Sequence, residues 1–84
     1  MENKVLIEII CPILETSYEI FVPVGKKIGT VIQLIIKSIN ELSEDNFPPD
    51  KEASLYSQTT GEKYSKNITV KDAKIVNGTK IIII

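Results

Sequence analysis

The sequence predicts an α+β domain in which one helix packs against a small β-sheet. Residues 28–42, IGTVIQLIIKSINEL, are the one stretch with a helical period, because apolar residues recur there every three or four positions. The other apolar runs alternate with a period of two, as strands do. A single helix of this length is marginal in water, and its β-branched isoleucines lower its helix propensity further. Its apolar side must therefore be covered by the strands.

The first two strands form a predicted hairpin. Lys4–Cys11 alternates, and Glu8 marks the solvent side of this strand, which it shares with Leu6 and Ile10. A proline ends the strand, and a short connection leads to a second strand at Tyr18–Val24. The inward side chains of the pair follow from the same alternation: Val5, Ile7, Ile9, Tyr18, Ile20 and Val22.

The helix follows the hairpin after the breaker Gly25. Its apolar stripe is predicted to face the sheet: Ile28, Val31, Ile32, Ile35, Ile39 and Leu42. Polar residues occupy the opposite side: Thr30, Gln33, Lys37 and Glu41. Leu34 lies beside the polar residues, so we expect an exposed leucine on the helix.

The second half of the chain supplies the remaining strands. Ala53–Ser57 is a predicted third strand, and Lys63–Tyr64 is a candidate for a short fourth. Val70–Ala73 fits a single helical turn. The last strand, Thr79–Ile84, carries four consecutive isoleucines, which favours a central position in the sheet.

The register of the last strand depends on Lys80. If Lys80 faces solvent, Ile81 and Ile83 belong to the core, whereas Ile82 and Ile84 lie on the outer face of the sheet.

This order of elements is that of a ubiquitin-like β-grasp, one helix on a mixed four- to five-stranded sheet with the expected strand order 2-1-5-3-4. The chain resembles ubiquitin-like proteins in its helix spacing, in Phe47-Pro48-Pro49-Asp50 after the helix, and in residues 70–79 before the last strand. Three segments are similar to the YukD/EsaB group of small proteins that accompany type VII secretion systems in Gram-positive bacteria: Val22-Pro23, Thr59-Thr60-Gly61 and Ile75-Val76-Asn77-Gly78. The resemblance implies this fold over residues 1–84 as a single domain, and a link to that secretion pathway.

Composition excludes most chemistry. His is absent and Cys11 is the only cysteine, so an internal disulfide and multi-cysteine metal sites are excluded and the usual general base is missing. Gly25–Thr30 lacks the order of a phosphate loop, because Thr30 follows Gly29 without an intervening lysine. We therefore predict no enzyme activity, no catalytic residue, no cofactor and no metal, and we interpret Cys11 as a buried thiol at the end of a strand.

Charge and hydropathy argue against nucleic acid and membranes as partners. The formal net charge is −1, and all ten cations are Lys, so the sequence offers neither a basic stripe for nucleic acid nor a guanidinium fork for phosphate. We interpret the lysines as solvated surface groups. No run approaches the roughly 20 apolar residues of a membrane span, and no leader precedes the first strand. We expect a cytoplasmic protein without membrane insertion.

The end of the sequence bears on ubiquitin-like chemistry. Ubiquitin and the bacterial sulphur carriers act through a flexible Gly-Gly tail, because activation as an acyl-adenylate needs an unhindered carboxylate. Here Ile84 is β-branched and is expected to remain paired in the sheet. We therefore do not expect conjugation or sulphur transfer, although a ubiquitin-like or sulphur-carrier modifier is kept as an alternative.

Protein binding is the function that the surface favours. The predicted binding residues on the outer sheet face are Leu6, Ile10, Ile82 and Ile84, with Phe21 and Tyr56 as neighbours. A covering loop or a register shifted by one residue would remove this surface, and Leu34 on the helix is the other candidate. The leading hypothesis is a non-enzymatic accessory or regulatory component of a type VII-like secretion system that binds secretion-machinery proteins. A self-associating structural protein, with the outer face as homodimer interface, is a further alternative.

Overall fold

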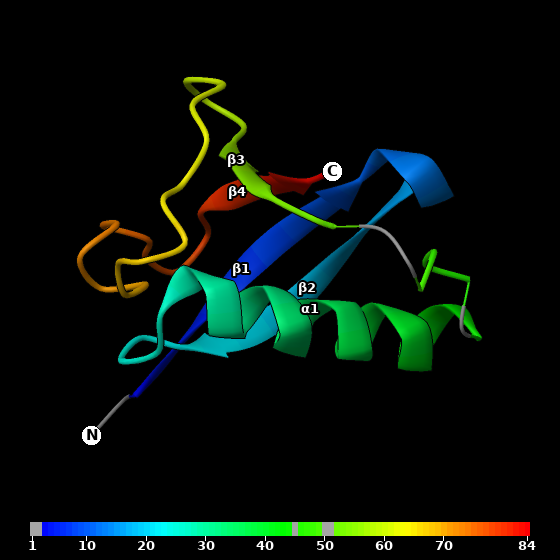
Figure 1. Cartoon of the computed structure of the whole chain (residues 1–84), viewed down its shortest axis with the longest axis horizontal. Coiled ribbons are helices and arrows are strands. Elements are labelled where there is room, and N and C mark those ends of the chain that lie inside the picture. The colour runs from blue at the N-terminus through cyan, green and yellow to red at the C-terminus, as the bar shows by residue number, and fades with distance from the viewer. Residues whose placement is uncertain (1–2, 45, 50–51) are drawn as a thin grey trace.

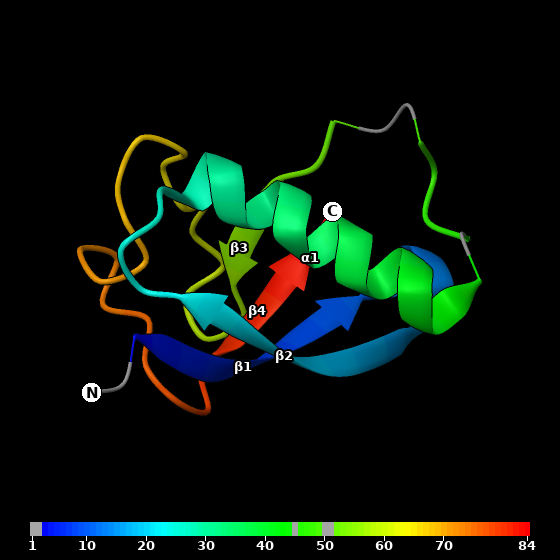
Figure 2. The same cartoon turned by 90° about the horizontal axis from the view of Figure 1, so that it is seen from below.

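The computed structural model describes residues 3–44, 46–49 and 52–84. Its elements in chain order are β1 (Lys4–Cys11), the 3-10 helix η1 (Pro12–Leu14), β2 (Thr16–Pro23), α1 (Ile28–Ser43), β3 (Leu55–Ser57) and β4 (Lys80–Ile83). Helix α1 crosses one face of a four-stranded sheet of order β2-β1-β4-β3 (Figures 1 and 2). Strands β1 and β4 run parallel, and the two outer pairs run antiparallel. The predicted helix on a mixed sheet is confirmed.

The predicted short strand at Lys63–Tyr64 is the main difference in the sheet. Lys63 forms only an isolated bridge with Tyr56, supported by a hydrogen bond from the Tyr64 N–H to the Leu55 carbonyl (2.9 Å). The following residues turn away from the sheet, because the Lys66 carbonyl accepts a hydrogen bond from the Gly29 N–H at the start of α1 (3.1 Å). The chain leaves the edge of β3 before a continuous ladder can form.

The connection between β1 and β2 is also tighter than the sequence suggested. Pro12 begins η1, and the Glu15 N–H donates to the Pro12 carbonyl (3.0 Å) with Glu15 in the left-handed region at φ 54°. Proline suits the first position of such a turn because its φ is fixed near the helical value. As a result β2 begins at Thr16 rather than Tyr18.

The core lies between α1 and the inward side of the sheet. Ile81 and Ile83 are fully buried, which confirms the register deduced from Lys80. The helix contributes five buried side chains of the predicted stripe: Ile28, Val31, Ile32, Ile35 and Ile39. Strands β1 and β2 contribute buried side chains to the same core: Ile7, Ile9, Cys11, Ile20 and Val22.

Leu42 was predicted to belong to this stripe, and that prediction is wrong, since 63% of the residue is exposed. It lies beyond the last buried turn of α1. Phe47 closes this end of the core instead, with 2% exposure and its N–H donating to the Asn40 Oδ1 atom (3.0 Å). Asp50, the last residue of the Phe47-Pro48-Pro49-Asp50 segment, lies outside the described residues.

The loop before β4 covers the start of α1. The Ile28 N–H donates to the Ile68 carbonyl (2.8 Å), and Val70 is fully buried. The predicted helical turn at Val70–Ala73 is a hydrogen-bonded turn, in which the Ala73 N–H donates to the Thr69 carbonyl (3.0 Å) and the Asp72 N–H to the Thr69 Oγ1 atom (3.0 Å).

Candidate functional site

The candidate site is the outer face, the sheet surface opposite α1. Side chains on this face line up in rows across the strands, because directly paired residues point to the same side. One row joins Ile10 to Ile82 across the parallel pair β1/β4, and Tyr56 of β3 continues it beside Ile82. Ile10, Ile82 and Tyr56 are half-buried, so this row offers a partly exposed apolar surface.

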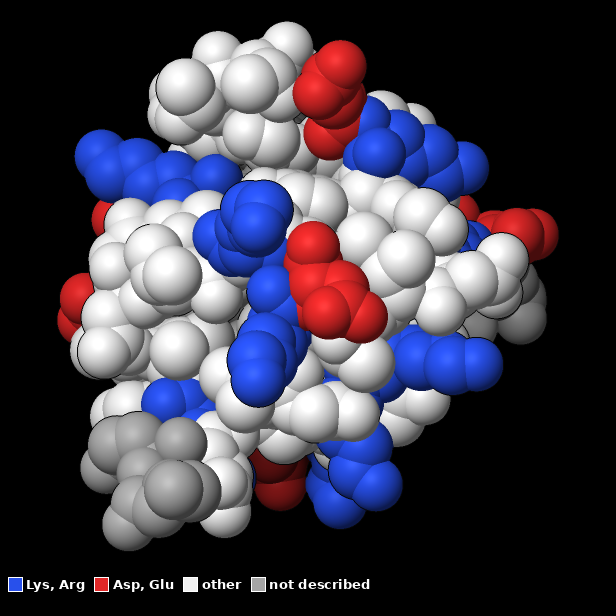
Figure 3. Space-filling model, turned by 90° about the vertical axis from the view of Figure 1, so that its left-hand side faces the viewer, with Lys and Arg blue, Asp and Glu red and all other residues white. Residues whose placement is uncertain are grey.

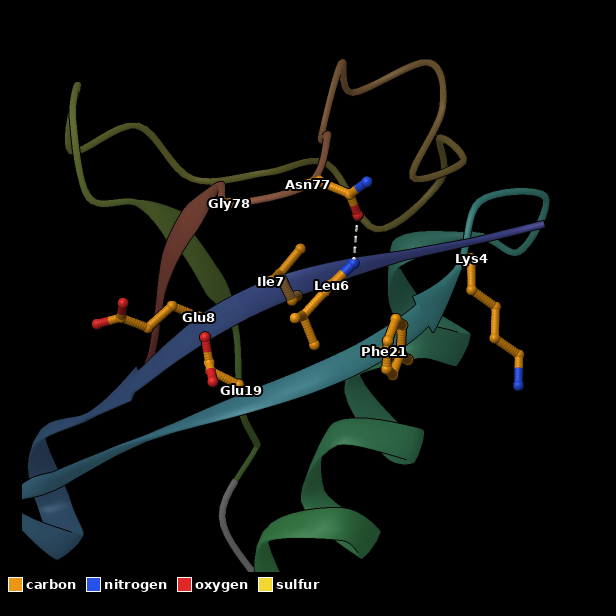
Figure 4. Close-up of a pocket in the computed structure, with 8 residues that line it drawn as sticks. All are labelled: Lys4, Leu6, Ile7, Glu8, Glu19, Phe21, Asn77 and Gly78. Carbon is orange, nitrogen blue, oxygen red and sulfur yellow. Dashed lines mark hydrogen bonds between the residues drawn. The ribbon is translucent and has the colours of Figure 1, made fainter. Parts of the chain in front are cut away.

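A second apolar pair lies towards the amino end of β1. Leu6 is paired with Phe21 of β2, and 62% of Phe21 is exposed. The turn before β4 fixes the backbone of Leu6, since its N–H donates to the Asn77 Oδ1 atom (2.7 Å) and its carbonyl accepts from the Gly78 N–H (2.8 Å) (Figure 4). Gly78 has φ +86°, a value that favours glycine at this position of a tight turn.

A charged row separates the two apolar groups. Glu8 lies between Leu6 and Ile10 on β1. It is paired with Glu19 of β2 on one side and with Lys80 of β4 on the other. Figure 4 shows the Glu8 and Glu19 side chains on the same side of the sheet as Leu6 and Phe21. Leu6 and Ile10 are four residues apart on a strand, about 13 Å. The predicted contiguous surface is therefore two apolar patches with a carboxylate pair between them.

Neither models of known protein families nor curated proteins match this sequence. Solved structures do match. The ubiquitin-like domain of the type VII secretion protein ECCD1 of Mycobacterium tuberculosis superposes with a TM-score of 0.76 at 13% identity, covering 99% of both chains. The EccD5 ubiquitin-like domain from Mycobacterium xenopi gives a TM-score of 0.79 at 13% identity, covering 99% of this chain and 94% of that one.

The chain has a ubiquitin-like β-grasp fold. A chain of the MycP5-free ESX-5 inner membrane complex contains a similar domain, with a TM-score of 0.79 at 11% identity over 99% of this chain and 21% of that one. Identities this low relate the folds, and they carry no residue roles from one protein to another.

Two predicted residues lie outside the strands of the sheet: Ile84 directly after the end of β4, and Leu34 on α1. Ile84 is 51% exposed and exchanges hydrogen bonds with Ser54, whose N–H donates to the Ile84 carbonyl (2.8 Å) and whose carbonyl accepts from the Ile84 N–H (3.0 Å). The backbone of Ile84 is thus hydrogen-bonded to the residue before β3, although β4 itself ends at Ile83. Its side chain shares a shallow hollow with Ile13 at the carboxyl end of β4. Leu34 is 42% exposed on α1, which places it on a different surface from the outer face.

Sequence reasoning missed three features of the β-grasp surface. Ile13 is half exposed, and the apolar periodicity gives no sign of it because it belongs to η1. Leu42 lines a groove between α1 and β2 together with Phe21. The Glu8 and Glu19 pair was visible as two separate solvent-side markers, and only the hairpin register places the two carboxylates opposite each other.

Within the described ranges, no group of three or more His, Cys, Asp or Glu residues is placed to hold a metal ion. Cys11 is a free, fully buried thiol, as the alternation of β1 predicted. The helices of the described chain are all too short or too polar to cross a bilayer.

Proposed function

We propose that this β-grasp domain is a non-enzymatic, cytoplasmic protein-binding module and an accessory or regulatory component of a type VII-like secretion system. The observation that carries the proposal is the uncovered outer face. Figure 2 shows α1 on the other side of the sheet, so the helix does not cover the rows built on Ile82 and Leu6, whose side chains are half-buried. Apolar side chains that neighbour one another on adjacent strands are unusual at a free surface.

The outer face also indicates what kind of partner fits. Like charges directly opposite each other in a sheet destabilise the pair, and Glu8 faces Glu19 in this way. Lys80 flanks Glu8 on its other side and offsets part of this repulsion. A Lys or Arg side chain of a partner placed over Glu19 would relieve the rest, while apolar side chains on either side of it would contact Leu6 and Ile82. We therefore propose a partner surface with a basic residue between two apolar ones.

The secretion link rests on similarity of fold and on the sequence resemblance to the YukD/EsaB group. Two of the solved structures with similar folds are ubiquitin-like domains of type VII secretion proteins and a third belongs to an ESX-5 inner membrane complex, whereas others are ubiquitin or ubiquitin-like domains of other proteins. Partners among secretion-machinery components follow from this as part of the proposal.

Co-purification from the source cells tests both parts. The tagged wild-type protein should retain secretion-machinery components, and Ile82→Lys and Leu6→Lys should lose them because a charge in an apolar contact must be desolvated without a counter-ion. Gln33→Lys on the exposed side of α1 is the matched control and should retain them. Loss with Leu34→Lys but not with Ile82→Lys would move the binding surface to the helix. Absence of machinery components from the wild-type sample would reject the secretion link.

A further inference from the structure

Lysines that are scattered along the sequence gather at one end of the molecule, which we name the lysine end. Its exposed members are Lys4, Lys26, Lys27, Lys71 and Lys74. Figure 3 views the molecule from this end and shows several basic side chains spread over a mostly uncharged face, with acidic groups near its centre, at its top and at its edges. Near-neutral overall charge therefore conceals a strongly uneven distribution.

Backbone contacts hold the lysine end together. The Lys71 N–H donates to the Val24 carbonyl (3.0 Å), and the Val70 N–H donates to the Lys26 carbonyl (3.1 Å). Lys4 is brought to the same end by its pairing with Pro23. Asp72 is the acidic residue of this turn, and Lys66 nearby forms an ion pair with Glu52 (3.7 Å). Positive charge is in excess there even after these carboxylates are counted.

The opposite end of the long axis carries glutamates, and we name it the glutamate end. The turn between β1 and β2, with Glu15, and the C-terminal end of α1, with Glu41 and Glu44, lie at the same end in both Figure 1 and Figure 2. All three glutamates are exposed. Lys37 is the one described lysine of α1, a turn before Glu41.

This arrangement does not serve the helix. Negative side chains favour a helix N-terminus and positive ones a C-terminus, yet the first turn of α1 has no acidic residue and the last turn no basic one. Lys26 and Lys27 precede the helix, and Glu41 and Glu44 end it, each with the unfavourable sign. The first N–H groups of α1 are already bonded to the carbonyls of Ile68 and Lys66 (2.8 and 3.1 Å), so the positive end consists of lysine side chains.

We propose that the lysine end of one copy docks against the glutamate end of a second copy. The two ends lie along the longest dimension of the molecule, 32 Å, and have opposite sign, whereas contacts between like ends would be repulsive. Such a contact is heterologous and repeats head to tail along the axis. Because each copy is close to neutral, with a net charge of −1, added copies do not build up repulsion. Exposed ion pairs are individually weak, so the contact depends on several of them and on low salt.

Sedimentation of the full chain at several concentrations tests the proposal. At about 10 mM salt, where charges act over about 30 Å, the average mass should rise with protein concentration. At about 1 M salt, where they act over about 3 Å, the association constant should fall at least about tenfold. A chain that stays monomeric at low salt and high concentration would overturn the proposal, and so would association that salt does not weaken.

Charge reversal makes the test specific. Lys26→Glu with Lys71→Glu should abolish association, as should Glu41→Lys with Glu44→Lys. An equimolar mixture of the two double variants should associate again, because each then offers what the other lacks. Lys63→Glu with Gln58→Glu and Thr59→Glu changes the net charge as much as the first variant but at exposed positions away from the lysine end, and should leave association intact. Circular dichroism verifies that every variant is folded.

Other occupants of the lysine end give different results. Failure of the mixture to associate would overturn the proposal. So would a wild-type chain that remains monomeric but binds anionic vesicles or polyglutamate, since the lysine end would then serve another anionic partner. Association that Ile82→Lys abolishes and charge reversal does not would assign the contact to the outer sheet face and would also overturn it.

Discussion

The two faces of the sheet are built by the same strands, yet their side chains differ in burial. Ile9 and Ile81 on the covered face have 0% exposure, whereas their neighbours Ile10 and Ile82 on the outer face are half-buried. Both pairs stand side by side across β1 and β4. The same residue type therefore supports folding at one position and is open to a partner at the next. Strand alternation alone makes this division.

A lysine placed on each face in turn is the strongest test of this difference between the two faces. Ile81→Lys should leave little folded population, because burying an unpaired charge against α1, or neutralising the lysine to avoid this, costs several kcal/mol, a large part of the roughly 5–15 kcal/mol by which small domains are stable. Ile82→Lys should remain folded and lose less than about 2 kcal/mol. Circular dichroism with thermal unfolding of both variants measures this. Similar destabilisation by the two would mean that the outer face is buried as well.

The helix offers the same contrast on a smaller scale. Ile35 is fully buried in the middle of the stripe, so Ile35→Ala should lower the free energy of unfolding by about 2–5 kcal/mol. Gln33→Ala, on the exposed side, should change it by less than about 0.5 kcal/mol. Urea titrations of both variants give the difference. Equal losses would show that α1 presents another face to the sheet.

Much of this division could be predicted from the sequence. Glu8 and Lys80 each mark one solvent-facing position. Because side chains alternate with a period of two, these positions predict which face every other residue of their strands points to, including the buried Ile81 and Ile83. The helical period assigns five positions of the stripe and fails at Leu42, because periodicity carries no information on where the sheet beneath the helix ends. Phe47 fills that end from a segment without any period.

The candidate site was less predictable because it depends on register between strands. Parity places Leu6 and Ile10 on the outer face, but the carboxylate pair between them requires Glu19 to stand opposite Glu8. That register follows from η1, which starts β2 at Thr16, and a tight turn of this kind was not foreseen. The lysine end was likewise hidden, since tertiary hydrogen bonds bring Lys26 and Lys71 together across 45 residues of sequence.

Thiol reactivity compares the two faces without disturbing the core. Cys11 on the covered face has 0% exposure and reacts only when β1 opens, so its labelling should be at least about a hundredfold slower than that of free cysteine. Phe21→Cys adds a thiol on the outer face that should label at nearly the free rate. Mass spectrometry over time counts the labels. Rapid addition of one label to the wild-type protein would reject the buried assignment of Cys11 and reopen a covalent role for it.

The smallest expected effect concerns the charged row of the outer face. Glu19→Lys replaces a like-charge pair with an opposite-charge pair against Glu8, and should raise the free energy of unfolding by about 0.2–1 kcal/mol. The gain should lie towards the lower limit, because Lys80 already flanks Glu8 on the other side. Glu19→Gln removes the repulsion only, so its free energy of unfolding should lie between those of the wild-type protein and Glu19→Lys. About 1 M salt should reduce the differences in free energy among the three proteins. If binding uses the carboxylate pair, Glu19→Lys should weaken it while stabilising the domain. Loss of stability on this substitution would mean that Glu19 stabilises the folded domain. The proposal that the Glu8 and Glu19 pair serves to bind a partner would then be rejected.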